Sequence, residues 1–178
     1  VLALTLPVYL WRIETLPQGR WGRGFLSGLV FGFGYFVAAF HWIAFAFFIN
    51  PADIWMMPFA VGGLALFMAG YWGIASALAM RVPRAVAPRW LAALLLIAVA
   101  EWLRGHLLTG FPWAVPGLAA DGMGAVAQLA SLVGMNGLTL LVLVWAALPA
   151  LLWSRWRRER TVSLAALAVL LCLPAAEL

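Results

Sequence analysis

The sequence predicts an all-helical protein, a polytopic bundle of helices that cross a membrane. Three observations support this: 66% of the 178 residues are hydrophobic, only 10% are charged, and the mean hydropathy is +1.03. Soluble domains have about 45–50% apolar and about 25% charged residues. The composition therefore excludes a cytosolic enzyme, a disordered tail and a nucleic-acid reader. At ~20 residues per span, this length accommodates roughly five to seven transmembrane helices.

Apolar runs separated by charged residues or by Pro and Gly predict the spans in order. We expect one partial span and about five complete ones, at residues 1–11 (partial), 24–49, 55–80, 90–109, 124–153 and 161–175. The first run is too short to cross a bilayer, and both chain ends lie in apolar runs, which predicts a fragment truncated at both ends. Small residues recur in the second run, and favour close helix packing over a ligand groove: Gly24, Gly28, Gly32 and Gly34.

The distribution of basic residues predicts the orientation in the membrane. All eleven are Arg, and loops 12–23, 81–89 and 154–160 carry three, three and four of them. The loops around Asp53 and Asp121 carry none. Because cytoplasmic loops are enriched in Lys and Arg, we expect the three Arg-rich loops to be cytoplasmic and the C-terminus to lie on the opposite side.

Two ionisable residues lie deep in the fourth predicted span. Glu101 is roughly 17 Å from residue 90 at ~1.5 Å per residue, and Arg104 follows one turn later. Residues three apart share a helix face, so we expect their side chains to pair. Because ionisable groups in hydrocarbon are costly, they point to function. The pair is either a structural contact that fixes helix packing or part of the lining of a substrate cavity.

A segment rich in Gly, Pro and aromatic residues follows this pair. Pro112 lacks an N–H donor and biases Phe111 out of helical geometry, so we expect a helix break or re-entrant segment at 110–123. Such backbone is tolerated at membrane depth beside protein or a water-filled cavity. A kink without a ligand is the alternative.

The remaining reactive residue types predict no chemistry within this chain. His41, next to Trp42, has no second His and no carboxylate at helical spacing, so we expect no metal and no cofactor. Cys172 has no neighbouring base or cation, and we expect it to be inert. The chain also lacks Lys and a phosphate-binding Gly loop. We therefore expect no catalytic residue here.

The stretch 101–113, EWLRGHLLTGFPW, closely resembles the membrane domain of bacterial apolipoprotein N-acyltransferases, which carry an E-x-L-R-G run followed by TGFPW. The glycine pattern of 24–34, followed by His41, looks like the third span of that family. Residues 134–138 resemble the glycine-rich start of its sixth span. His41 and His106 stand where the family more often has Asn and an aromatic residue.

The resemblance implies transfer of an acyl chain from a phospholipid to the diacylglyceryl-cysteine of lipoproteins, at the outer face of the bacterial inner membrane. In the family, the reacting Glu, Lys and Cys belong to a nitrilase-like domain after the seventh span. That domain has no counterpart here, so we expect this chain alone to be inactive. Its expected partners are the phospholipid donor, the lipoprotein acceptor and the bilayer.

The resemblance also implies a lip beside a cleft that admits lipid tails. Phe111, Pro112 and Trp113 would form this lip, and Arg104 would either meet a phosphate or hold Glu101. The candidate substrate contacts are Trp113, Phe111, Pro112, Gly110, Arg104, Glu101, His41 and Trp42.

Two other functions stay open. One is a non-catalytic membrane module that anchors a partner enzyme, such as a glycosyltransferase that uses a lipid-linked sugar. The coding sequence beyond Leu178 distinguishes this module from the acyltransferase. The other is a small transporter, which typically has inverted repeats and opposing discontinuous helices, whereas the sequence predicts only one break.

Overall fold

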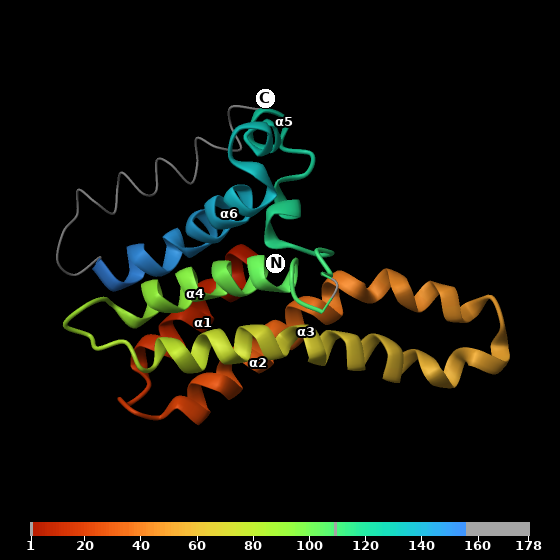
Figure 1. Ribbon diagram of the computed structural model, residues 1–178, viewed down its shortest axis with the longest axis horizontal. Coiled ribbons are helices and arrows are strands. Elements are labelled where there is room, and N and C mark those ends of the chain that lie inside the picture. Colours follow the sequence, from red (N-terminus) through yellow and green to blue (C-terminus); the bar gives the residue numbers. More distant parts are fainter. Residues whose placement is uncertain (1, 109, 156–178) are drawn as a thin grey trace. The chain divides into compact units, whose positions relative to one another are not determined.

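The computed structural model describes residues 2–108 and 110–155, and all regular elements in this part of the chain are helices (Figure 1). Residues Arg12–Ala114 form one compact unit, and the other described residues form a second. The first unit contains the end of α1 together with α2 to α4, and the second contains residues 2–11 of α1 together with η3, α5 and α6. The elements are α1 (Leu2–Thr15), α2 (Trp21–Phe40), η1 (His41–Phe48), η2 (Pro51–Met56), α3 (Met57–Ala79), α4 (Arg89–Arg104), η3 (Pro116–Ala120), α5 (Gly124–Gln128) and α6 (Ala130–Arg155).

Three helical stretches are long and apolar enough to cross a membrane. They are Trp21–Phe48, Pro51–Ala79 and Ala130–Pro149, which correspond to the second, third and fifth predicted spans. Helices α1 and α4 have 14 and 16 residues, fewer than the ~20 of a typical span. Helix α4 ends at Arg104, before the predicted end of its span at residue 109. The predicted span 161–175 lies outside the described residues.

Helices α2 and α3 form an antiparallel hairpin whose tip differs from the expected α-helix. Residues 41–48 and 51–56 are 3₁₀-helical, and the hairpin continues past the end of α4 (Figure 1). The turn is fixed by Asn50, whose side-chain oxygen accepts a hydrogen bond from the Ala52 N–H at 3.2 Å. The Asn50 amide also donates to the Asp53 carboxylate at 3.1 Å. Pro51 occupies the first turn of η2, where a missing N–H is tolerated.

Glycines on α2 allow it to approach α3 closely. Gly24, Gly28 and Gly32 are buried against α3, which confirms the packing interpretation for these three. A Cβ added to Gly32 would lie 3.1 Å from the Cα of Ala69. The expectation was wrong for Gly34, which has no neighbour within 4 Å of an added Cβ. Spacing explains this difference, because positions 24, 28 and 32 repeat every four residues along one face, whereas position 34 lies on another face.

At the opposite end of the first unit, α1 and α4 cap each other. The Glu14 carboxylate accepts a hydrogen bond from the Trp90 N–H in the first turn of α4, at 3.1 Å. In return, Arg89 Nη1 donates to the Leu16 carbonyl just beyond α1, at 2.6 Å. Arg84 donates to the Glu14 carbonyl and pairs with its carboxylate at 3.4 Å. These contacts satisfy backbone groups that helix ends leave free.

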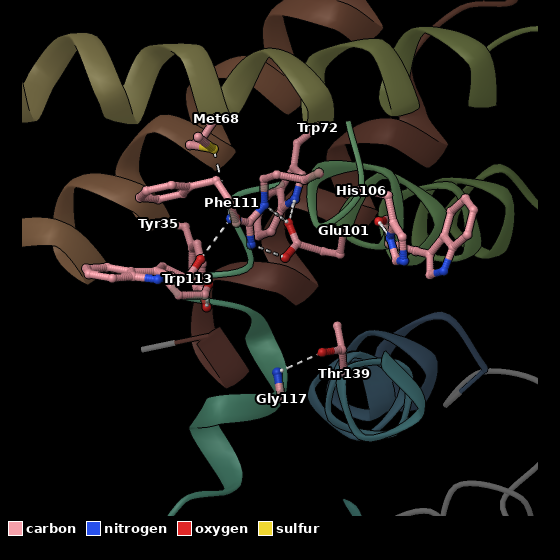
Figure 2. A network of polar contacts seen from close by, with 12 residues as sticks. Tyr35, Met68, Trp72, Glu101, His106, Phe111, Trp113, Gly117 and Thr139 are labelled. Carbon is pink, nitrogen blue, oxygen red and sulfur yellow. Dashed lines mark hydrogen bonds and ion pairs between the residues drawn. The ribbon is translucent and has the colours of Figure 1, made fainter. Parts of the chain in front are cut away.

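In the second unit, the predicted span 124–153 is interrupted. Helix α5 ends at Gln128, and α6 contains a non-helical residue, Gly134, with φ 69° and ψ 173°. Glycine tolerates a positive φ because it has no Cβ. Beyond this kink, the hydroxyl of Thr139 accepts a hydrogen bond from the Gly117 N–H at 3.2 Å (Figure 2). This contact joins η3 to the side of α6.

We predict that Gly28→Ala destabilises the protein, because the added methyl would collide with Ser76 and with the Trp72 carbonyl. Overpacking of this kind costs about 1–3 kcal/mol. Gly34→Ala on the same helix is the matched control, because its methyl enters open space and Ala favours helix by up to ~1 kcal/mol. Thermal unfolding in detergent compares the two variants. Equal midpoints for both would contradict the packing interpretation.

Candidate functional site

A buried ion pair lies at the C-terminal end of α4. Arg104 Nη2 donates to Glu101 Oε2 at 2.5 Å, and Arg104 Nε donates to Glu101 Oε1 at 3.2 Å (Figure 2). The pairing predicted from the spacing of three residues is therefore confirmed. Glu101 is 2% exposed and Arg104 1% exposed. Two parallel hydrogen bonds of this type fix direction as well as distance, because the guanidinium and the carboxylate are both planar.

Helices α2 and α3 enclose the ion pair. The indole N–H of Trp72 on α3 donates to Glu101 Oε1 at 2.7 Å. The guanidinium carbon of Arg104 lies 5.2 Å from the ring centre of Phe36 on α2, within the range of a cation–π contact. Met68 places its sulfur 3.9 Å from Arg104 Nη1. Each charge is thus compensated by groups of this chain, as burial in an apolar surrounding requires.

The third nitrogen of Arg104 holds the segment that follows α4. Nη1 donates to the main-chain carbonyls of Phe111 and Trp113, at 2.6 and 2.8 Å. In the reverse direction, the Phe111 N–H donates to the Arg104 carbonyl at 2.9 Å. The Tyr35 hydroxyl of α2 donates to the next carbonyl, that of Ala114, at 3.0 Å. Side chains therefore satisfy the carbonyls of residues 111, 113 and 114, which lie in an irregular segment.

The helix ends earlier than Pro112 predicts. Gly105 closes α4, and the chain then folds back so that Gly110, with φ 76°, lies against the carbonyl of Gly105. Pro112 itself is exposed and follows the fold-back. Arg104, the last residue of α4, donates hydrogen bonds to the carbonyls of residues 111 and 113 in the segment that folds back. The lack of an N–H in Pro112 predicts that a helix breaks, but it does not predict the hydrogen bonds of Arg104 to this segment.

Three aromatic side chains form a stack on this segment, which we call the aromatic stack: Trp42, Phe111 and Trp113. The rings of Trp42 and Trp113 are stacked with centres 5.6 Å apart, and those of Phe111 and Trp113 with centres 5.5 Å apart. Trp42 is 48% exposed and Trp113 is 52% exposed, whereas Phe111 is half-buried. Phe40 supports the inner end, with its ring edge against Phe111. The two Trp rings of the stack are therefore partly accessible from outside the described chain.

The two histidines make only local contacts among those described. His41 Nδ1 lies 2.7 Å from the Ala38 carbonyl, and the ring contacts Phe45. His106 Nδ1 lies 2.7 Å from the Trp102 carbonyl, and its ring lies over that of Trp102. Figure 2 shows His106 on the opposite side of Glu101 from Trp113. The structure thus joins Glu101, Arg104 and the aromatic stack, but not His41, into one network.

The sequence did not reveal two members of the network, Trp72 and Tyr35. Both lie inside predicted spans, where an indole N–H or a hydroxyl needs a partner. Glu101 in a neighbouring span was the obvious acceptor for Trp72. The partner of Tyr35, a main-chain carbonyl of an irregular segment, left no signal in the sequence.

We predict that Gly110→Ala disrupts the fold-back. The positive φ costs an L-residue about 1–2 kcal/mol, and the added methyl would also collide with the Gly105 carbonyl. Gly122→Ala is the control for the first effect alone, because Gly122 has φ 81° and open space around it. Thermal unfolding in detergent should show a larger loss for Gly110→Ala. A loss equal to that of Gly122→Ala would mean that the close approach to Gly105 is unimportant.

Comparison with known proteins places the chain in a family. Residues 1–148 match the family model described as apolipoprotein N-acyltransferase N-terminal domain. The chain is 38% identical over 140 residues to the apolipoprotein N-acyltransferase of Rhodopseudomonas palustris. This match covers 76% of the chain and 26% of that protein. The enzyme of the same name from Bradyrhizobium diazoefficiens is 41% identical over 141 residues, with the same coverage. That from Caulobacter vibrioides is 43% identical over 113 residues, or 63% of the chain and 21% of that protein. The chain thus spans about a quarter of the length of these relatives, and it belongs to the apolipoprotein N-acyltransferase family, matching its N-terminal domain.

Proposed function

We propose that this chain is the membrane portion of an enzyme that transfers an acyl chain from a phospholipid to the N-terminal diacylglyceryl-cysteine of lipoproteins. Its relatives carry the name of this activity, and their similarity extends over about three-quarters of the chain. The three long apolar helical stretches suit a protein that works on lipids inside a bilayer. The single observation that carries the proposal at the level of residues is the exposed aromatic stack at the end of α4.

The reacting groups of this activity belong to a part of the protein outside this chain. Acyl transfer through a thioester needs a nucleophilic thiolate with a base or cation near it. The only cysteine, Cys172, lies outside the described residues, and its sequence neighbours are apolar. The chain also contains no Lys. We therefore propose that the chain alone is inactive and that a nitrilase-like domain in the intact protein supplies the chemistry.

The aromatic stack has the physical properties of a lipid contact. Trp42 and Trp113 are about half exposed, their largely apolar rings suit an acyl chain, and an indole N–H suits the polar headgroup level. The two rings stack with their centres 5.6 Å apart, so they form one continuous apolar contact. Gly110 and Pro112 shape the segment that carries Phe111 and Trp113. We propose that these residues form the lip over which the donor's acyl chain enters.

The positions of the Arg residues support an orientation in the bacterial inner membrane. We propose that loops 12–23, 81–89 and 154–160 face the cytoplasm. The turn at Asn50 and Asp53 and the C-terminal end of the chain would then face outward, where lipoproteins are acylated. The mutual capping of α1 and α4 by Glu14, Arg84 and Arg89 would lie at the cytoplasmic end.

We predict that Trp113→Ala in the full-length protein slows acylation of a diacylglyceryl-cysteine peptide by roughly 10-fold or more, because the acyl chain loses an apolar contact worth on the order of 1.5–3 kcal/mol. Folding should be preserved, because Arg104 binds the carbonyl and not the side chain of residue 113. Purified enzyme in phospholipid micelles is assayed for the acylated peptide.

The matched control is Trp102→Ala. Trp102 is 47% exposed, similar to Trp113, but it contacts His106 and not the aromatic stack. We expect near-normal activity from this variant. Normal activity in Trp113→Ala would refute the proposed lip. A full-length protein that lacks a nitrilase-like region and acylates nothing would instead support the alternative of a membrane module that anchors a partner enzyme.

We also predict the sidedness of the loops. In a Cys172→Ser background, a cysteine at Asp53 or Asp121 should react with a membrane-impermeant maleimide added to intact spheroplasts. A cysteine at Arg20 should react only after the membrane is permeabilised. Mass spectrometry measures the labelled fraction. The opposite labelling pattern would reverse the proposed orientation.

A further inference from the structure

We propose that Arg104 is a positioning residue for acyl transfer, which acts by setting where the aromatic stack meets the lipid. This inference rests on the proposed function of the stack. Arg104 does not itself contact the substrate in this proposal. It binds the main chain of the two residues, Phe111 and Trp113, whose side chains form the accessible surface.

The geometry leaves Arg104 unsuited to bind a lipid phosphate. Nε and Nη2 donate to Glu101, and Nη1 donates to the carbonyls of Phe111 and Trp113 (Figure 2). All three nitrogens are therefore engaged by groups of this chain. With 1% of the residue exposed, an incoming phosphate would have to displace these partners. The contacts thus favour a role for Arg104 on the segment after α4 over a role on the substrate.

The segment depends on this one side chain because it is irregular. Its carbonyls at residues 111 and 113 have no helical partner, and an unsatisfied carbonyl in an apolar surrounding is unfavourable. The main-chain contact from the Phe111 N–H to the Arg104 carbonyl closes the same loop from the other side. Without the guanidinium, we expect the segment to move and to carry the ring of Trp113 away from Trp42.

The shape of the guanidinium explains why the residue is Arg and not Lys. One planar group reaches both carboxylate oxygens of Glu101 and, from its third nitrogen, two carbonyls. A Lys ammonium is a single point on a flexible stem and does not reproduce this fork. Arg104→Lys should therefore keep the charge opposite Glu101 while losing at least one contact to the segment.

The test is a double-mutant cycle in the full-length enzyme with Arg104→Met, Trp113→Ala and the combination, with phospholipid and acceptor peptide as substrates. A displacement of about 1 Å at a site can cost on the order of 100-fold. We expect Arg104→Met to lower kcat/KM for the phospholipid by about 10- to 100-fold. The combination should lose little beyond the larger single effect, because both changes remove the same surface.

Arg89→Met is the matched control. Arg89 is also an Arg of α4, is fully buried and donates to a main-chain carbonyl, but it contacts Leu16 at the far end of the helix. We expect Arg89→Met to lower the thermal midpoint and to keep kcat/KM per folded molecule. If Arg104→Met fails to fold, Arg104→Lys takes its place in the cycle.

Each outcome separates this inference from the proposed function. Coupled losses at Arg104 and Trp113, with Arg89→Met active, support the positioning role. Losses that multiply independently, or an Arg104 variant that keeps wild-type kcat/KM, overturn it even if Trp113→Ala is impaired. Full activity in Trp113→Ala overturns the proposed function of the stack, and the positioning role with it.

Discussion

The arrangement of the candidate site depends on the ion pair between Glu101 and Arg104 inside an apolar bundle. Charges buried without compensation are costly, and removal of one partner of a buried pair costs about 3–5 kcal/mol. Here the carboxylate accepts from Arg104 and from Trp72, while the guanidinium donates to Glu101 and to two carbonyls. The pair is therefore stable only if α3, α4 and the segment after α4 are all in place. This requirement joins three parts of the chain to one another.

The ion pair lies at the point where α4 ends, since Arg104 is its last residue. A helix C-terminus leaves carbonyls without partners, and the usual solutions are a glycine cap or a cation. Gly105 follows with helical backbone angles (φ −73°), so it is not a left-handed cap, and the Arg104 side chain reaches past the helix end to the carbonyls of Phe111 and Trp113. The fold-back brings Trp113 against Trp42 of the first hairpin. The buried Arg104 thereby contacts the main chain of Phe111 and Trp113, two residues of the aromatic stack.

Sequence reasoning succeeded where the physics is local or additive. Apolar length predicted the helical bundle, and a spacing of three residues predicted the contact between Glu101 and Arg104. It failed where a contact joins a side chain to distant backbone, because a carbonyl carries no residue identity. The break at Gly105 and the partner of Tyr35 are of this kind. The 3₁₀ geometry of the hairpin tip also left no signal, since 3₁₀ and α patterns are similar over short runs.

Arg104 donates its hydrogen bonds to main-chain carbonyls and not to side chains. The path of the main chain in this segment is therefore independent of the side chains that it carries. Arg104 contacts only the main chain at positions 111 and 113, so its hydrogen bonds do not depend on which side chains these positions carry. Gly110 has no such freedom, since its positive φ and its approach to Gly105 exclude a side chain. A division of this kind suits a lipid-facing site. The ring of Trp113 is half-exposed, whereas the Arg104 side chain that holds its main chain is buried.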